Sequence, residues 1–505
     1  MKDSRTKNAI FNIVFAFILQ LISALSGLIL PRLIIPKYGS DVNGLIVSIT
    51  QFLSYVSLLE GGVEGVIRSS LYKPMAEKDM NKVSSILKGA VNFFRKVAVI
   101  FIIYLVFLCL LYPVIVAKNF DPVFTILMIL ILSLGTFLQY YFSLPYISLF
   151  SADQKVRIVY VTDGIIILLN LIISFILISL NCDILIVKLV SSLLFIIKPL
   201  LFIIYAKYKY KLRLKDKNIH PEEIKQKWNG LAHHLAYFIH INTDVFIISL
   251  FLTTSDVSVY AVYYAIVSAV ERVISSISVG SAAGIGNLIN TASKEHINDV
   301  VDRFEFVQGA LTTILYTIVC LVIIPFIKLY TVEMTDINYI KPMFAYAIIL
   351  AEAMYCIRLI YSTITFNANK FKETQAHAIV ECATNLVISF ALIWKFGLFG
   401  IAIGTALGML IRIILDVLYL SKNVIERKIK KIVKFMSINV VICVISILIC
   451  KPIVSYIFDN SWWSWIISSS LCGILVCVIS LILYFIFYRE VLIKSIKLIK
   501  IFKHK

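Results

Sequence analysis

Long uncharged apolar stretches, such as those at Val97–Ala117 and Val123–Leu134, restrict more than any other feature how this chain can fold. Stretches of roughly 18–25 apolar residues match the hydrocarbon thickness of a bilayer. Lipid offers no hydrogen-bond partner to backbone N–H and C=O groups, so such stretches must be helices, which satisfy these groups internally. The sequence therefore predicts an all-α integral membrane protein.

Basic residues are unevenly distributed between these stretches. The net charge is +19 and the mean hydropathy is +0.92. The lysines and arginines lie in short segments between apolar stretches, a membrane pattern, so no nucleic-acid partner is expected. With the N-terminus in the cytoplasm, roughly three quarters of the 48 lysines and arginines fall on the cytoplasmic side, as the positive-inside rule requires. The sequence predicts a multi-pass protein with both termini in the cytoplasm.

About fourteen membrane spans are expected. The largest loop between them is basic and separates the first six spans from the next six. The predicted organisation is a six-helix lobe at 1–206, a cytoplasmic linker at 207–230, a second six-helix lobe at 231–428, and two extra helices with a basic tail at 429–505. The expected spans are 8–31, 42–66, 95–117, 123–148, 158–180, 184–206, 231–254, 257–283, 304–328, 341–366, 374–394, 398–421, 435–456 and 463–488.

The two six-span halves resemble each other in sequence. Asn170–Ile178 aligns with Asn385–Ile393 at an offset of 215, with seven of nine residues identical. The same offset places Ser40–Val42 on Ser255–Val257. Because each half has an even number of spans, both enter the membrane in the same direction, which predicts a parallel repeat with its pseudo-twofold axis along the membrane normal. Two such lobes are typical of transporters that open a central cavity to either side in turn.

Ionisable residues within spans are costly in lipid, so each is a functional candidate. The seventh span places His233, Tyr237, His240 and Asp244 on one helix face. We interpret His240 as substrate-binding and Asp244 as ion-coupling. The alternative is polar packing between helices.

The second span carries two further candidates for ion coupling, Glu60 and Glu64, followed by Arg68 at the same four-residue spacing. Glu64 and Arg68 are correctly oriented for an i,i+4 pair, whereas Glu60 has no nearby cation in the sequence. Glycines at 61, 62 and 65 predict either a bend or the close approach of another helix.

Three arginines in separate spans, Arg32, Arg272 and Arg358, are the candidates for substrate binding. Guanidinium groups bind phosphate oxygens in a bidentate manner, which suits a diphosphate-bearing substrate. The alternatives are that Arg272 pairs with a carboxylate such as Glu60 or Asp244, that Arg358 pairs with Glu352, and that Arg32 reaches the outer headgroups.

The remaining charged pairs are interpreted as structural, and the sequence lacks the common catalytic motifs. Arg412 and Asp416 are interpreted as a structural i,i+4 pair. The nine cysteines form no CxxC pair or metal-ligand cluster. The sequence has no Walker A loop, HExxH or GxSxG motif, so neither a cofactor nor a catalytic site is expected. A transporter is favoured over an enzyme.

The start of the chain resembles that of a known family. A basic N-terminus, a first span ending in Leu30–Leu33, and the pairs Tyr38-Gly39 and Gly44-Leu45 around the start of the second span are similar to the Wzx-type polysaccharide flippases of the multidrug/oligosaccharidyl-lipid/polysaccharide exporter superfamily. The duplicated halves and the basic central loop extend this resemblance over essentially the whole chain. Asn43 departs from the pattern, since an aromatic residue often precedes that glycine.

The resemblance implies a flippase of the bacterial cytoplasmic membrane. Such a protein moves undecaprenyl-diphosphate-linked oligosaccharides to the outer leaflet by alternating access, for the assembly of O-antigen, capsule or exopolysaccharide. The implied partners are this lipid-linked oligosaccharide, membrane lipids, a polysaccharide polymerase and a chain-length regulator. Alternatives within the superfamily are a drug/cation antiporter and a lipid II flippase. A membrane-embedded polysaccharide polymerase is the alternative from another class.

Overall fold

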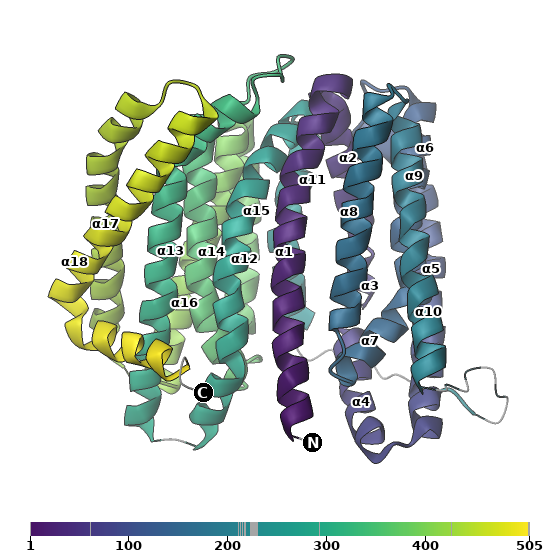
Figure 1. Ribbon diagram of the computed structural model, residues 1–505, viewed down its shortest axis with the longest axis horizontal. Helices are drawn as coiled ribbons and strands as arrows, with labels where there is room; N and C mark the ends of the chain where they lie inside the picture. The colour runs from purple at the N-terminus through teal and green to yellow at the C-terminus, as the bar shows by residue number, and fades with distance from the viewer. Residues whose placement is uncertain are drawn as a thin grey trace. The chain divides into compact units, whose positions relative to one another are not determined.

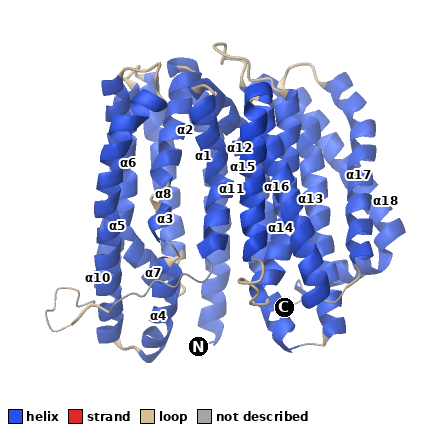
Figure 2. Ribbon diagram, turned by 180° about the vertical axis from the view of Figure 1, so that it is seen from behind, coloured by secondary structure: helices blue, strands red, loops and turns tan. Residues whose placement is uncertain are grey.

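The computed structural model consists of long helices joined by short loops (Figures 1 and 2). It describes residues 2–60, 62–210, 212, 214, 216, 219–222, 231–291, 293–425 and 427–502. Within these ranges, the side chains of residues 2–7, 9, 10, 231–237, 239–241, 283, 290, 291 and 496–502 lie outside the description. No strand occurs in the described part, which confirms the all-α prediction.

Thirteen helical segments in the described part are long and apolar enough to cross a membrane. The remaining expected span, 231–254, corresponds to α11, whose described apolar stretch is Asn242–Phe251. The helices are α1 Lys2–Tyr38, α2 Ser40–Ser54, α3 Ser57–Glu60, α4 Val63–Glu77, α5 Met80–Ile115, α6 Pro122–Leu138, η1 Gln139–Ser143, α7 Leu144–Ala152, α8 Arg157–Ser179, α9 Ile184–Leu193, η2 Leu194–Ile196, α10 Ile197–Tyr210, α11 Leu231–Phe251, α12 Thr254–Thr291, α13 Lys294–Tyr330, α14 Pro342–Asn367, α15 Gln375–Phe396, α16 Leu398–Asn423, α17 Ile429–Ile457 and α18 Trp462–Phe502.

The chain forms two compact units. The first contains residues 1–238 and 245–262, and the second contains 239–244 and 263–505. The end of α11 and the start of α12 therefore pack with the first unit, although they follow the linker in sequence. The division of lobes at 207–230 that the sequence suggests stays a prediction.

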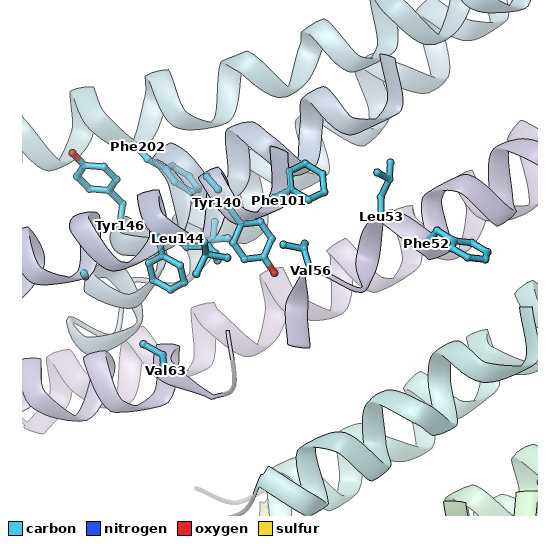
Figure 3. Packing of buried hydrophobic residues seen from close by; sticks show 14 of the residues in the cluster. Phe52, Leu53, Val56, Val63, Phe101, Tyr140, Leu144, Tyr146 and Phe202 are labelled. Atoms are coloured by element: carbon cyan, nitrogen blue, oxygen red, sulfur yellow. The ribbon is translucent and has the colours of Figure 1, made fainter. Parts of the chain in front are cut away.

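The first unit has one continuous apolar core, formed mainly by α2, α4, α5, η1 and α7 (Figure 3). Phe94, Phe101 and Phe150 are fully buried in it. By contrast, one side of α5 presents Val106, Phe107 and Leu110 outward. Exposed apolar side chains on a long helix suit contact with lipid acyl chains, since lipid is as apolar as the protein interior.

Glycines allow the closest helix pair of the second unit to form. Gly400, Gly404 and Gly408 recur every four residues on α16 and face α15. A Cβ atom at Gly404 would lie 2.2 Å from the hydroxyl oxygen of Ser389. In a membrane, small residues at this spacing let two helix backbones approach and gain van der Waals contact. This packing fixes the polar residues of α15 against α16.

The related segments of the two halves form the same local hydrogen bond. Ser174 on α8 donates to the side-chain oxygen of Asn170 at 3.3 Å, and Ser389 on α15 donates to that of Asn385 at 3.0 Å. Ser174 and Ser389 are both buried. The similarity at an offset of 215 is therefore matched by local structure.

Candidate functional site

The second span is broken where it carries Glu60. Helix α2 ends at Ser54, α3 is a single turn ending at Glu60, and α4 begins at Val63. Gly62 has a φ of +79°, a left-handed conformation that glycine adopts without strain. A continuous span was expected here, and the structure instead uses the glycines to interrupt the helix. Interrupted helices at membrane depth are tolerated where they are packed in protein or line a cavity.

A second irregular helix lies against this break. The π-helix η1 contains Tyr140, whose hydroxyl donates a hydrogen bond to the Glu60 carboxylate. π-helices occur frequently at functional sites. Glu64, one turn further along on α4, lies close enough to Tyr160 for an electrostatic interaction. The first unit thus combines a half-buried carboxylate, a phenol partner and two departures from regular helix.

The N-terminal ends of α2 and α12 are joined by polar contacts, and α2 also contacts α11. Asn43 donates from Nδ2 to the Oγ of Ser258 at 2.7 Å, and Ser48 and Ser249 hydroxyls are 2.6 Å apart. The contact is tight, because a Cβ atom at Gly44 would lie only 1.7 Å from the Thr254 carbonyl oxygen. These are contacts within the first unit.

This contact joins positions that the sequence similarity relates. Asn43 and Ser258 are separated by 215 residues, the same offset that aligns the two halves. Nearby, Asp41 accepts hydrogen bonds from the hydroxyls of Thr254 and Ser255. Two related helix ends therefore meet each other through related residues, as expected for a contact on a twofold axis.

Three carboxylates gather in the second unit. Asp244 on α11, Glu271 on α12 and Glu352 on α14 lie close enough to interact electrostatically. Asp244 and Glu352 are buried, at 5% and 6% exposed. Thr405 on α16 donates to the Asp244 carboxylate at 3.1 Å. Like charges in a desolvated site require compensation, and Arg272 beside Glu271 supplies part of it.

Arg358 lies in a separate charge cluster formed by α14, α15 and α16. It is buried, and its Nη1 is 3.9 Å from Glu381. Arg412 contacts Glu381 at 3.4 Å and Asp416 at 2.8 Å, and Asp416 also contacts His377. Two guanidinium groups thus face two carboxylates in this cluster. The predicted Arg412–Asp416 pair is present. The acidic partner of Arg358 is Glu381 rather than Glu352.

The first unit has a simpler ion pair between its corresponding spans. Lys198 on α10 lies 2.8 Å from Asp163 on α8. Burying one charge in such a place without its partner is strongly unfavourable. In both units, therefore, opposite charges join the fifth and sixth spans of a half.

The remaining predicted site residues are distributed as follows. Arg32 on α1 and Arg272 on α12 are partly exposed, Arg32 in the first unit and Arg272 in the second. The side chains of His233, Tyr237 and His240 lie outside the described residues. The assigned roles of all the candidates, including Glu60, Glu64 and Asp244, stay predictions.

Two candidates were missed in the sequence. Glu271 was not considered, and Glu352 was considered only as a partner of Arg358. Each is an acid inside an apolar span, which is a sufficient reason to consider it. What the sequence did not reveal is that these two acids and Asp244, from three helices, lie together.

The fold is similar to that of solved structures of a lipid flippase and of multidrug transporters. No family model and no curated protein matches the sequence.

Three solved structures carry this similarity. The lipid II flippase MurJ, in an inward closed conformation, has a TM-score of 0.66 at 18% identity, over 96% of this chain and 100% of that protein. An inward-facing multidrug resistance MATE family transporter has a TM-score of 0.60 at 13% identity, over 83% of this chain and 94% of its own. The MATE multidrug transporter DinF-BH gives 0.59 at 14% identity, over 82% and 95%.

Proposed function

We propose that this protein is a flippase of the bacterial cytoplasmic membrane that carries an undecaprenyl-diphosphate-linked oligosaccharide to the outer leaflet. The observation that carries the proposal is the extent of the fold similarity. The lipid flippase matches 96% of the chain, whereas the multidrug transporters match 82–83%. The chain up to the end of α16 is 423 of 505 residues, or 84%. We expect the larger coverage by the lipid flippase if α17 and α18 also have counterparts in that protein.

The chemistry of a lipid-linked diphosphate suits part of the predicted site. Arg32 and Arg272 are partly exposed and carry permanent charge, so both remain candidates for phosphate contact. Arg358 is the weaker candidate, because it is buried whereas the other two are partly exposed. A lipid substrate also requires that its polyprenyl chain stay in the bilayer, since transferring an apolar chain to water is costly.

Alternating access requires a contact that opens. We assign this role to the N-terminal ends of α2 and α12, where Asn43, Ser48 and Asp41 form hydrogen bonds to α11 and α12. Hydrogen bonds between neutral groups contribute about 1 kcal/mol each and those to a charged group about 1.5–3 kcal/mol, which allows such a contact to open repeatedly. Coupling to a proton or another cation is assigned to Glu60 in the first unit, with Glu64 nearby, and to Asp244 with Glu271 and Glu352 in the second.

A reconstituted transport assay tests the proposal. Purified protein in liposomes is given a fluorescent undecaprenyl-diphosphate-linked sugar, and the fraction in the outer leaflet is measured with an impermeant quencher. We expect protein-dependent translocation, with Arg272→Ala reducing the rate at least tenfold. Lys430→Ala, an exposed lysine on α17, is the control that should retain the rate. Unchanged translocation by Arg272→Ala excludes this arginine, and no translocation by the native chain rejects the lipid-linked substrate.

One observation favours a second function. The cluster of Asp244, Glu271 and Glu352 suits a cationic substrate as well as a coupling ion, since carboxylates compensate positive charge. A drug/cation antiporter is therefore the alternative. Proton-driven uptake of ethidium into the same liposomes, without movement of the lipid-linked sugar, is the result that selects it.

A further inference from the structure

A cavity of about 220 Å³ lies in the second unit between α13, the start of α17 and the last part of α18. Its walls are partly aromatic, with Phe306 and Phe435, and partly charged, with Arg427 and Lys434. Pockets for drug-sized molecules are larger, roughly 300–1,000 Å³. The cavity therefore suits a small charged group that is attached to something apolar.

Arg427 is fixed in the wall of this cavity by two carboxylates. Its Nη1 pairs with Asp302, and its Nη2 is 2.8 Å from Glu305. Glu305 also accepts a hydrogen bond from Tyr361 at 2.5 Å. Arg427 is only 6% exposed, yet its Nε has no hydrogen-bond partner among the described residues. A buried N–H group without an acceptor is costly, so the cavity offers a fixed donor that an added acceptor would satisfy.

Two further donors border the same cavity. The hydroxyl of Tyr488 is buried and has no hydrogen-bond partner in the described part of the chain. The ammonium group of Lys434 lies 5.6 Å from the centre of the Tyr488 ring. Lysine and arginine side chains can only donate hydrogen bonds. The site therefore has an excess of donors, and an anion with several acceptor oxygens would complete it.

The carboxylates of this region do not cancel its preference for an anion. Asp302 contacts both Arg427 and Lys431, the latter at 3.3 Å, and Glu305 is occupied by Arg427 and Tyr361. Their negative charges are thus compensated by Arg427 and Lys431. Lys434 remains as the additional positive charge beside the cavity.

The position along α18 identifies the source of the anion. The helix departs from helical geometry at Tyr488, where φ is −136°. Before this residue α18 is an apolar span, and after it the sequence alternates between basic and apolar residues up to Phe502. Such a bend marks the level of the lipid headgroups, on the side that the basic residues assign to the cytoplasm.

We propose that this cavity binds the phosphate of an anionic phospholipid from the cytoplasmic leaflet. Arg427, Tyr488 and Lys434 donate to the phosphate oxygens, and Phe306 and Phe435 contact the apolar start of the acyl chains. Basic residues at a membrane surface attract anionic lipids. The site is separate from the proposed transport path and does not depend on the identity of the transported substrate.

Native mass spectrometry of the full chain in detergent tests the proposal. Phosphatidylglycerol is titrated against zwitterionic phosphatidylethanolamine, and the lipid-bound fraction is measured. We expect a preference for phosphatidylglycerol that falls about tenfold in Tyr488→Phe and in Lys434→Gln, as expected when one hydrogen bond to a charged group is lost. Lys430→Gln removes the same charge from the same helix away from the cavity, and should leave the affinity unchanged.

Each other outcome rejects the proposal. Equal binding of the two lipids removes the role of charge. An equal loss of phosphatidylglycerol affinity in Lys434→Gln and Lys430→Gln shows that the preference comes from general surface charge rather than from the cavity. Displacement of phosphatidylglycerol by millimolar inorganic phosphate identifies a free-phosphate site instead of a lipid site. Both variants retain the apolar contacts of the fold, and an unchanged melting temperature confirms that they are folded.

Discussion

Replacing Gly44 by alanine should force apart the N-terminal ends of α2 and α12. The added Cβ atom would lie 1.7 Å from the Thr254 carbonyl oxygen, where ordinary contact requires at least 3.4 Å. The backbones must therefore separate by roughly 1.7 Å. The Asn43–Ser258 hydrogen bond is 2.7 Å long. Lengthening it by half of that displacement already takes the donor–acceptor distance beyond the usual limit of about 3.2 Å.

The free-energy change follows from these distances. Losing two hydrogen bonds costs about 2 kcal/mol, and overpacking adds about 1–3 kcal/mol. A change of about 3 kcal/mol in favour of the open contact corresponds to a factor of roughly 100 in its population. Transport should fall, because a contact that no longer closes interrupts the cycle.

Cysteine labelling measures this shift. Val257→Cys, at a buried position next to Ser258, is labelled with an impermeant maleimide in a background without the nine native cysteines. The labelling rate should rise at least tenfold when Gly44 becomes alanine. The reporter is common to both proteins, so the comparison isolates the methyl group. Gly27→Ala is the matched control, since nothing lies within 4 Å of a Cβ atom there. Equal labelling rates with glycine and alanine at position 44 would refute the reasoning.

Three further changes test other parts of the structure. Arg412→Met should destabilise the protein by about 3–5 kcal/mol, because it leaves the buried Glu381 and Asp416 carboxylates with one guanidinium group fewer. An unaltered melting temperature in detergent would contradict the role of this charge cluster in stability. Glu352→Gln should abolish transport driven by an ion gradient while substrate binding persists, and retained gradient dependence would exclude this acid. Gly404→Ala should lower stability by about 1–3 kcal/mol, through the clash with Ser389, whereas equal stability would show that α15 and α16 can separate.

The fold was largely predictable because lipid restricts the choice so strongly. The span at Arg157–Ser179 lies within one residue of its expected limits of 158 and 180. The extensions of α5, α12 and α13 beyond their expected spans were not predicted, since helices continue beyond the apolar stretch once their backbone is satisfied. The break after Glu60 was suggested by glycine positions but could not be distinguished from close helix packing.

The polar groups were identified individually but not in their combinations. Arg412 and Asp416 were paired correctly, because an i,i+4 spacing fixes two side chains on one helix face. Arg358 and Glu381 come from different helices, and only the tertiary packing of α14, α15 and α16 brings them together. The grouping of Glu352 with Asp244 has the same origin. Partners on separate helices carry no fixed sequence spacing, so their pairing required the structure.

The hydrogen bond between Asn43 and Ser258 shows what is gained when two similar halves lie in one chain. In a dimer of two identical six-helix chains, a residue on the axis meets its own copy, and both members must be the same amino acid. Joining the copies into one polypeptide removes that restriction. Here one position is an amide that donates and the other a hydroxyl that accepts. A junction within one polypeptide can therefore hold a directed hydrogen bond between unlike residues.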